Sequence, residues 1–218
     1  MASDNHTIKT NKKRSLSGTF FVTCIFDIKK TTVRQTKEKQ MKHLFLFTLL
    51  IVAGTMTAQK VNWMSMEEAL AAQEKAPKKI FMDVYTTWCG PCKLLDKNTF
   101  GDKQVADFIN ANYYPVKFNA EGNEEITYND FTYTNPNYVP GKRGRNSQHL
   151  LAHALKITGY PSLVFFEADG TLIQAIPGYK TPKQLEIYLK MIANNDYKTL
   201  TTASAWQEYQ ENFKGTFK

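Results

Sequence analysis

The chain has 218 residues, enough for one or two domains, and its 42% hydrophobic and 13% aromatic residues suffice for an ordinary globular core. Its formal net charge of +8 is unevenly distributed. Residues 1–58 contain 10 Lys/Arg and 3 Asp/Glu, whereas the other 160 residues contain 18 Lys/Arg and 17 Asp/Glu. The part that follows residue 58 is therefore nearly neutral, and nucleic acid is not an expected partner.

The first 58 residues divide into two stretches. A short basic start at Met41, an apolar run over 44–53 and small residues up to Ala58 form the pattern of a secretory signal peptide. The apolar run is too short to span a bilayer, although an uncleaved membrane anchor is the alternative. We interpret residues 1–40 as an artefact of a misassigned start, with Met41 as the true one, or as a disordered extension in which Cys24 has no evident partner. The pattern predicts a periplasmic or otherwise exported protein.

The mature part, 59–196, is expected to begin with a helix and a strand. Ser65 and Glu68 have the spacing of a capping box, which predicts a helix over 66–75. The apolar run 79–85 then predicts a buried strand, in which Asp83 is the exception. A carboxylate inside a buried strand is costly unless it has a partner or a function, so an exposed edge position is the alternative.

That strand leads into Trp88-Cys89-Gly90-Pro91-Cys92-Lys93, and a helix is expected over 90–99. Two cysteines at this spacing can close a disulfide, and the start of a helix favours a reactive thiolate there. Pro91 suits the first helical turn, and Gly90 leaves room for a partner chain. A structural zinc site and an inert disulfide are the alternatives, but the sequence holds no second pair of cysteines for zinc.

A surplus segment follows the next predicted elements, which are a helix capped by Asp102 and a strand over 113–119. The segment covers roughly 120–147 and contains Gly141-Lys142-Arg143-Gly144-Arg145. It leaves the end of a strand at the edge where open α/β sheets place their sites. We hypothesise a flap beside the cysteines that shapes substrate access; a packed surface loop is the alternative.

The last third is expected to hold a helix, a hairpin and two more helices. His149 and His153 on the helix 148–155 lie four apart, but without a third ligand no metal site is predicted. Strands over 163–166 and 171–176 flank the Asp169-Gly170 turn, and Thr181 can cap the next helix. Aromatic residues at helical spacing predict a short helix in the tail, 197–218, folded back on the body, with partner docking as the alternative.

The WCGPCK motif after a strand, together with the later Gly159-Tyr160-Pro161, resembles the thioredoxin family over roughly 60–195. The resemblance implies an α/β thioredoxin fold, with a mixed central sheet flanked by helices and an insertion before a cis-proline loop. It implies that Asp83 lies beneath Cys92 and takes and returns the proton of the Cys92 thiol. Burial is expected to raise the pKa of Asp83. The resemblance also places Lys117 near Asp83; a solvated lysine at the strand end is the alternative. The Tyr160–Pro161 bond would be cis and face the cysteines.

The function implied is thiol–disulfide exchange on protein disulfides outside the cytoplasm, in the reducing direction that Gly-Pro between the cysteines resembles. The dithiol carries the electrons, so the expected partners are substrates and an unidentified reducing partner, with no cofactor, and the protein is expected to be a monomer. A non-catalytic binding or chaperone module is the rival. We expect Cys89 to be ionised and open to solvent. The candidate residues are Cys89, Cys92 and Asp83 as catalytic, Trp88, Gly90, Pro91, Tyr160, Pro161 and Gly178 as substrate-binding, and Lys117 as supporting.

Overall fold

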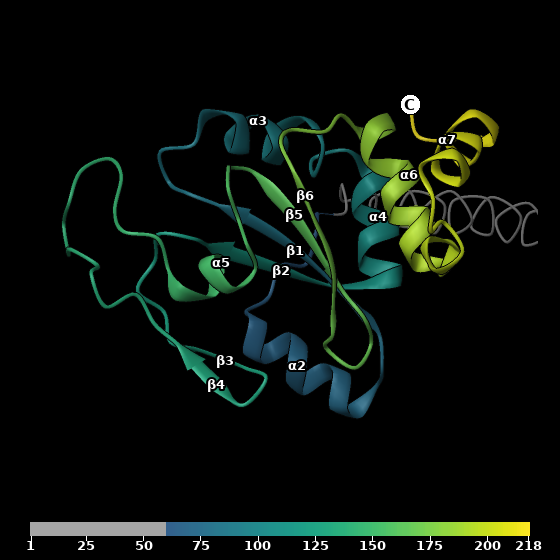
Figure 1. Cartoon of the computed structure of the whole chain (residues 1–218). Coiled ribbons are helices and arrows are strands. Elements are labelled where there is room, and N and C mark those ends of the chain that lie inside the picture. Colours follow the sequence, from purple (N-terminus) through teal and green to yellow (C-terminus); the bar gives the residue numbers. More distant parts are fainter. Residues whose placement is uncertain (1–59) are drawn as a thin grey trace, which may run out of the picture. The chain divides into compact units, whose positions relative to one another are not determined.

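The computed structural model describes residues 60–218 (Figure 1). The predicted signal peptide, the segment before it and Cys24 lie outside the described residues. Over 60–218, no helix combines the length and the apolar character needed to cross a bilayer.

A four-stranded sheet in the order β2-β1-β5-β6 forms the centre of this part (Figure 1). The strand β1 pairs in parallel with β2 and antiparallel with β5, and β5 pairs antiparallel with β6. The mixed sheet, parallel in its first half and antiparallel at the last hairpin, is therefore confirmed. The strands are β1 (Lys79–Tyr85), β2 (Tyr113–Asn119), β5 (Ser162–Phe166) and β6 (Leu172–Pro177).

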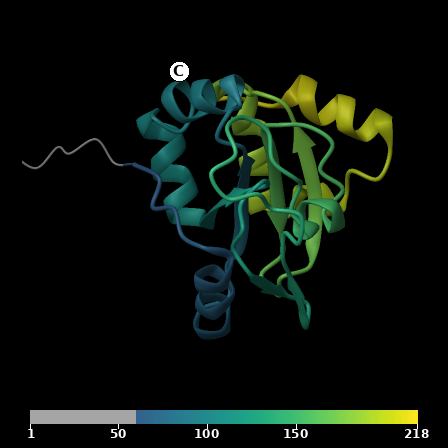
Figure 2. The same cartoon turned by 90° about the vertical axis from the view of Figure 1, so that its left-hand side faces the viewer.

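Helices cover both faces of the sheet (Figures 1 and 2). The predicted caps are present: Ser65 and Glu68 form a capping box, and Asp102 accepts hydrogen bonds from two N–H groups of the next helix. Two core clusters assign α2 (Met66–Lys75) and α5 (Leu150–Ala154) to one face, and α3 (Gly90–Asn98), α4 (Lys103–Asn112) and α6 (Pro182–Ala193) to the other.

The side chains of β1 alternate between the two clusters, as they must in a strand. Ile80, Met82 and Val84 pack toward α2 and α5, whereas Phe81 packs toward the other three helices. Asp83 has the same parity as Phe81, so its carboxylate belongs to the face that α3 covers.

The C-terminal segment contains a short 3₁₀ helix, η1 (Asp196–Lys198), and α7 (Ala203–Asn212). The aromatic spacing therefore predicted a helix correctly. The Trp206 ring stacks on that of Tyr188 of α6, with centroids 5.7 Å apart. Glu186, completely buried on α6, accepts hydrogen bonds from the N–H groups of Thr216 and Phe217. The segment is thus held against α6 by aromatic packing and by a buried carboxylate.

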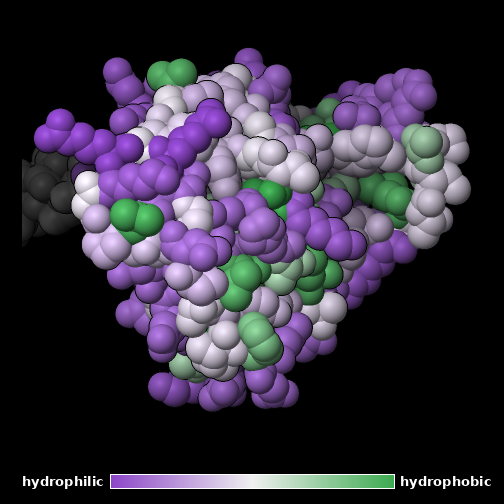
Figure 3. Space-filling view, turned by 60° about the vertical axis from the view of Figure 1, so that its left-hand side comes forward, coloured by the Kyte–Doolittle hydropathy of each residue, from purple (hydrophilic) through white to green (hydrophobic). Residues whose placement is uncertain are grey.

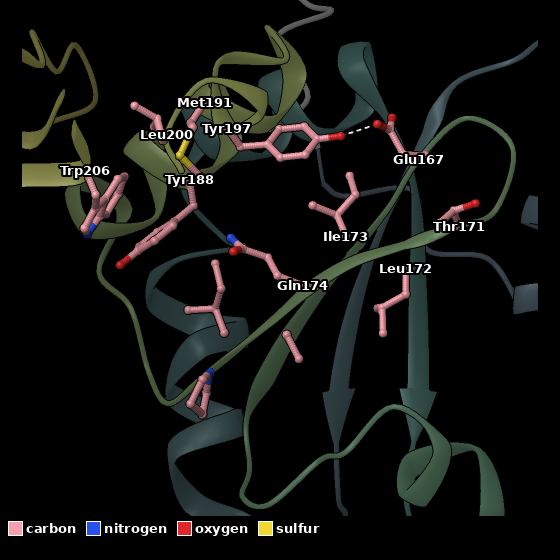
Figure 4. A pocket seen from close by; sticks show the side chains of 13 residues that line it. Glu167, Thr171, Leu172, Ile173, Gln174, Tyr188, Met191, Tyr197, Leu200 and Trp206 are labelled. Carbon is pink, nitrogen blue, oxygen red and sulfur yellow. Dashed lines mark hydrogen bonds between the residues drawn. The ribbon is translucent and has the colours of Figure 1, made fainter. Parts of the chain in front are cut away.

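A pocket of about 630 Å³ lies between β6 and the C-terminal helices (Figure 4). At one end the Glu167 carboxylate accepts a hydrogen bond from the Tyr197 hydroxyl and pairs with the ammonium groups of Lys79 and Lys198. Although partial burial raises it, these neighbours lower the pKa of Glu167 to about 2 overall. None of the candidate site residues lines the pocket. We therefore expect the ion pairs of Glu167 at its polar end to stabilise the fold and not to bind a substrate.

Glu167→Gln is expected to flatten the acid dependence of stability. Because the pKa of Glu167 is lower in the folded chain than its ordinary value of 4.5, its charge stabilises the fold above that pH. This contribution is lost as the pH falls from 4.5 toward 2. Urea unfolding measures the free energy of unfolding at pH 7 and at pH 3. Its decrease between these two pH values should be about 1 to 2 kcal/mol smaller in the variant than in the unmodified chain.

The matched control is Glu125→Gln, which removes an exposed carboxylate that makes no ion pair among residues 60–218. Its acid dependence should follow that of the unmodified chain. Equal losses in the Glu167 and Glu125 variants would contradict the assignment.

Candidate active site around Cys89 and Cys92

Cys89 and Cys92 form a disulfide at the N-terminus of α3. Cys89 is the N-cap residue, and its Sγ accepts a hydrogen bond from the Cys92 N–H at 3.1 Å. Pro91 occupies the first helical turn, where its missing N–H costs nothing. In the reduced protein, the same N–H and the helix dipole favour a thiolate at Cys89.

The predicted solvent exposure of Cys89 is wrong for this disulfide form, because the residue is only 2% exposed. The bond ties its sulfur to Cys92, which faces the buried side of α3 and is also 2% exposed. Gly90 and Pro91 beside it are exposed, and within residues 60–218 no atom beyond the neighbouring residues and the helix's own backbone lies within 4 Å of where a Cβ on Gly90 would stand. An incoming chain therefore finds open space at Gly90 rather than over Cys89.

Asp83 is completely buried in β1, so the alternative of an exposed edge position is wrong. The Lys117 Nζ lies 2.9 Å from its Oδ2, and the two residues are paired in the β1–β2 register. Within the described residues, neither carboxylate oxygen has a hydrogen-bond partner of good geometry. Burial raises the pKa of Asp83 to about 6, even though Lys117 opposes the rise. A carboxyl with this pKa can take and release a proton near neutral pH.

Lys117 joins Asp83 to α3, which excludes the reading of it as a merely solvated lysine. Its ammonium also donates a hydrogen bond to Asp96, four residues after Cys92 and so on the same side of α3. Burial lowers the pKa of Lys117, but the two carboxylates outweigh that effect and raise it overall. Asp83 therefore faces the helix that carries Cys92. Sequence reasoning missed Asp96, although its spacing from Cys92 was available as a signal.

The loop before β5 lies beside the cysteine motif. The Tyr160–Pro161 bond is cis, as predicted. Gly178 has a φ of +87° and donates its N–H to the Pro161 carbonyl at 2.8 Å, so it adjoins the cis-proline. The Tyr160 ring meets the ring of Trp88 edge-on, with centroids 6.0 Å apart. The candidate binding residues of both loops are therefore brought together.

Trp88 is also held by the segment 120–147. The Glu121 carboxylate accepts a hydrogen bond from the Trp88 indole N–H at 2.8 Å and another from the Asn146 N–H at 2.7 Å. The Arg145 guanidinium lies over the indole, 4.5 Å from its ring centroid. Both ends of the segment thus reach the residue that precedes Cys89, and sequence reasoning missed the role of Glu121.

The hypothesis of a flap is wrong for the first half of this segment and stays a prediction for the second half. Its first half forms a separate hairpin, β3 (Ile126–Tyr128) and β4 (Phe131–Tyr133). Ile126 and Tyr128 are buried in the core cluster under α2, and the Tyr128 hydroxyl donates to the Gly170 carbonyl at 2.9 Å. This hairpin therefore agrees with the alternative of a packed surface loop, not with a flap.

His149 has a structural role as the N-cap of α5 and is completely buried. Its Nδ1 accepts the Leu151 N–H at 3.0 Å, which leaves Nε2 to donate to the Glu124 carbonyl at 2.8 Å. His153 is exposed. In the described range 60–218, no three histidine, cysteine, aspartate or glutamate side chains are grouped as metal ligands would be.

Comparison with known proteins decides the family. A family model described as a thioredoxin-like domain matches residues 66–193, more than half of the chain. The chain belongs to this thioredoxin-like family. Its thioredoxin-like domain contains the cysteine pair, Asp83 and the cis-proline within the matched range.

Individual relatives are similar over the same thioredoxin-like region. The chain is 26% identical over 135 residues to the thiol:disulfide interchange protein DsbD of Pectobacterium atrosepticum, covering 61% of this chain and 19% of that protein. The solved structure of the DsbH oxidoreductase is 18% identical, covering 65% of this chain and 89% of that one, with a TM-score of 0.46. The solved structure of a thioredoxin-fold protein from Helicobacter pylori is 16% identical. The match covers 66% of this chain and 94% of that one, with a TM-score of 0.48.

The chain spans less than a fifth of the length of the curated relative. What is shared is the thioredoxin-like domain of a thiol–disulfide oxidoreductase, and this domain carries the Cys89–Cys92 disulfide.

Proposed function

We propose that the chain is an exported thiol–disulfide oxidoreductase that reduces protein disulfides. The observation that carries the proposal is the Cys89–Cys92 pair at the start of α3 with the buried carboxyl of Asp83 on the sheet face that α3 covers. The signal-peptide pattern over 41–58 supports export. Gly-Pro between the cysteines, which resembles the reducing thioredoxins, supports the direction.

In the first step, the Cys89 thiolate attacks one sulfur of a substrate disulfide. A mixed disulfide between Cys89 and the substrate forms, the substrate bond breaks, and the other substrate sulfur leaves as a thiolate and takes a proton from solvent. The N–H of Cys92, which donates to Cys89 Sγ, stabilises the attacking thiolate before this step.

In the second step, Asp83 accepts the proton of the Cys92 thiol, and the resulting thiolate attacks Cys89 Sγ. The Cys89–Cys92 disulfide forms, the bond between Cys89 and the substrate breaks, and the second substrate sulfur leaves as a thiolate that takes a proton from solvent, while Asp83 returns its proton to solvent. Two electrons pass from the dithiol to the substrate disulfide, so the exchange needs no cofactor. A dithiol partner must then reduce the pair again.

Substrate binding is assigned to the surface around the cis-proline. The Tyr160 backbone before Pro161 can pair with an extended substrate chain, as an added strand would. Gly178 adjoins Pro161 and carries no side chain, so the substrate backbone can approach. Trp88, Gly90 and Pro91 border the same surface beside Cys89.

Reduction of insulin by dithiothreitol tests the proposal. The wild-type chain should accelerate precipitation of the insulin B chain, whereas Cys89→Ser should not exceed the rate of dithiothreitol alone, because the attacking sulfur is missing. Equal acceleration by both proteins would instead favour the non-catalytic binding or chaperone module.

A further inference from the structure

A basic loop lies beside the cysteine pair and has no part in the proposed chemistry. It is residues 134–147, the second half of the inserted segment, and Lys142, Arg143 and Arg145 in it are all exposed. Throughout residues 60–218, no carboxylate forms an ion pair with any of these three side chains. The charges of Lys142 and Arg143 are therefore free to meet a partner, whereas Arg145 also lies over the Trp88 ring.

Side chains brace this loop in one arrangement. The Asn135 amide donates to the carbonyls of Gly122 and Ser147, each at 2.8 Å, which closes the base of the loop. Asn146 exchanges two hydrogen bonds with the backbone of Val139, at 2.9 and 3.0 Å, across its middle. A loop with these cross-links presents its charges at little cost in conformational entropy.

The loop is attached to the catalytic motif itself. Arg145 stacks on Trp88, the residue before Cys89, and Glu121 binds both Trp88 and the backbone of Asn146. Lys142 and Arg143 precede Arg145 by three and two residues in the same braced loop, so the fixed end of the loop limits how far their charges can lie from the cysteine motif.

The face of the molecule that carries the loop is mainly hydrophilic (Figure 3). Hydrophobic side chains appear there as separate spots among polar and charged ones, not as one continuous patch. This face therefore offers a partner mainly polar and charged groups, with no continuous apolar patch.

We propose that the basic loop selects protein substrates in which acidic residues flank the reactive disulfide. Three unpaired cations within four residues complement two or three carboxylates on an extended segment bound along the cis-proline loop. The inference rests on the proposed function and names the substrate class of the same site.

Two disulfide-linked peptides test this selection. They are identical except that the residues beside each cysteine are glutamate in one and glutamine in the other. The second-order rate constant for oxidation of the reduced protein is followed through the change in tryptophan emission. The glutamate peptide should react roughly 10-fold faster at about 20 mM salt, and this preference should fall to roughly 2-fold at about 0.5 M, where charges are screened.

The variant Lys142→Gln/Arg143→Gln should reduce the preference to roughly 2-fold or less at low salt. It keeps Arg145, so an unchanged difference in emission between the oxidised and reduced forms shows that the loop still contacts Trp88. Lys75→Gln/Lys214→Gln is the matched control, since it removes two exposed charges remote in sequence from the loop and should keep the full preference.

Three results would overturn the inference. One is equal reactivity of the two peptides with the wild-type chain, and another is a preference that survives in the loop variant. The third is a combination of two observations: the wild-type chain binds vesicles containing phosphatidylserine and the loop variant does not, while neither protein distinguishes the two peptides. That result would assign the charges of the loop to a membrane surface. Absence of reaction with both peptides overturns the proposed function as well, whereas reaction without preference overturns this inference alone.

Discussion

Cys92→Ser is expected to stay covalently joined to its substrate through Cys89 and to lose turnover by roughly 1000-fold or more. Cys89 keeps its place as the N-cap of α3 and the N–H of residue 92, so it can still attack a substrate disulfide. The serine hydroxyl is too weak a nucleophile to release the mixed disulfide. Non-reducing electrophoresis and intact-mass measurement after reaction with a protein disulfide should show a 1:1 adduct that dithiothreitol removes.

Cys89→Ser is the matched control for trapping. It should give no adduct when the part from residue 59 onward is used, because Cys92, the thiol that remains there, is 2% exposed and lies on the inner side of α3. Adducts of equal yield on both variants would contradict the assignment of Cys89 as the attacking residue. The adducts trapped in cell extracts would then identify substrates and test for acidic flanking residues.

The sequence predicted the elements well where the signal is local. The Ser65 capping box, the apolar run 79–85 and the Asp-Gly turn each depend on residues within one turn or one strand, and each is found in the structure. Element ends differ by a residue or two, as for α5, predicted over 148–155 and found at Leu150–Ala154.

The contacts that sequence reasoning missed, in the site and at the C-terminal segment, join residues far apart in the chain. Glu121 and Trp88 are 33 positions apart, and no periodicity indicates that the insertion returns to the cysteine motif. Glu186 looks like an exposed position on an amphipathic helix, yet it is buried because the backbone at Thr216 and Phe217 donates to it. The position of each carboxylate depends on segments that only the assembled fold brings close.

The burial of Cys89 has a related cause. A CxxC motif at a helix start predicts a reactive pair, but the exposure of its first sulfur depends on which bond that sulfur makes. In the disulfide form the bond to Cys92 holds it at 2% exposure. The pattern of residues predicts the chemistry of the pair and not the exposure of each oxidation state.

Asp83→Asn is expected to stabilise the oxidised chain at pH 7 by about 1 to 3 kcal/mol and to slow turnover roughly 10- to 100-fold. The pKa of Asp83 rises from 3.8 to about 6 on folding, so the folded chain holds this proton more tightly than the unfolded one. The stability associated with the protonated form is fully present below pH 3.8 and is lost as the pH rises through 6. Asparagine does not ionise, so the variant does not lose this stability at pH 7. The Lys117 ammonium is not left without a carboxylate, because it still contacts Asp96.

Urea unfolding at pH 4 and pH 7 measures the first effect, and the pH dependence of turnover between pH 5 and 8 measures the second. The wild-type profile should rise around pH 6 as Asp83 becomes able to accept the Cys92 proton, and the variant should lack this rise. Asp130→Asn, at an exposed turn with a φ of 60° that asparagine tolerates, controls for the loss of one carboxylate and should preserve the rise. A rise near pH 6 that persists in Asp83→Asn would assign the proton acceptor to another group. A gain in stability without any loss of turnover would make Asp83 a buried charge that Cys92 does not use.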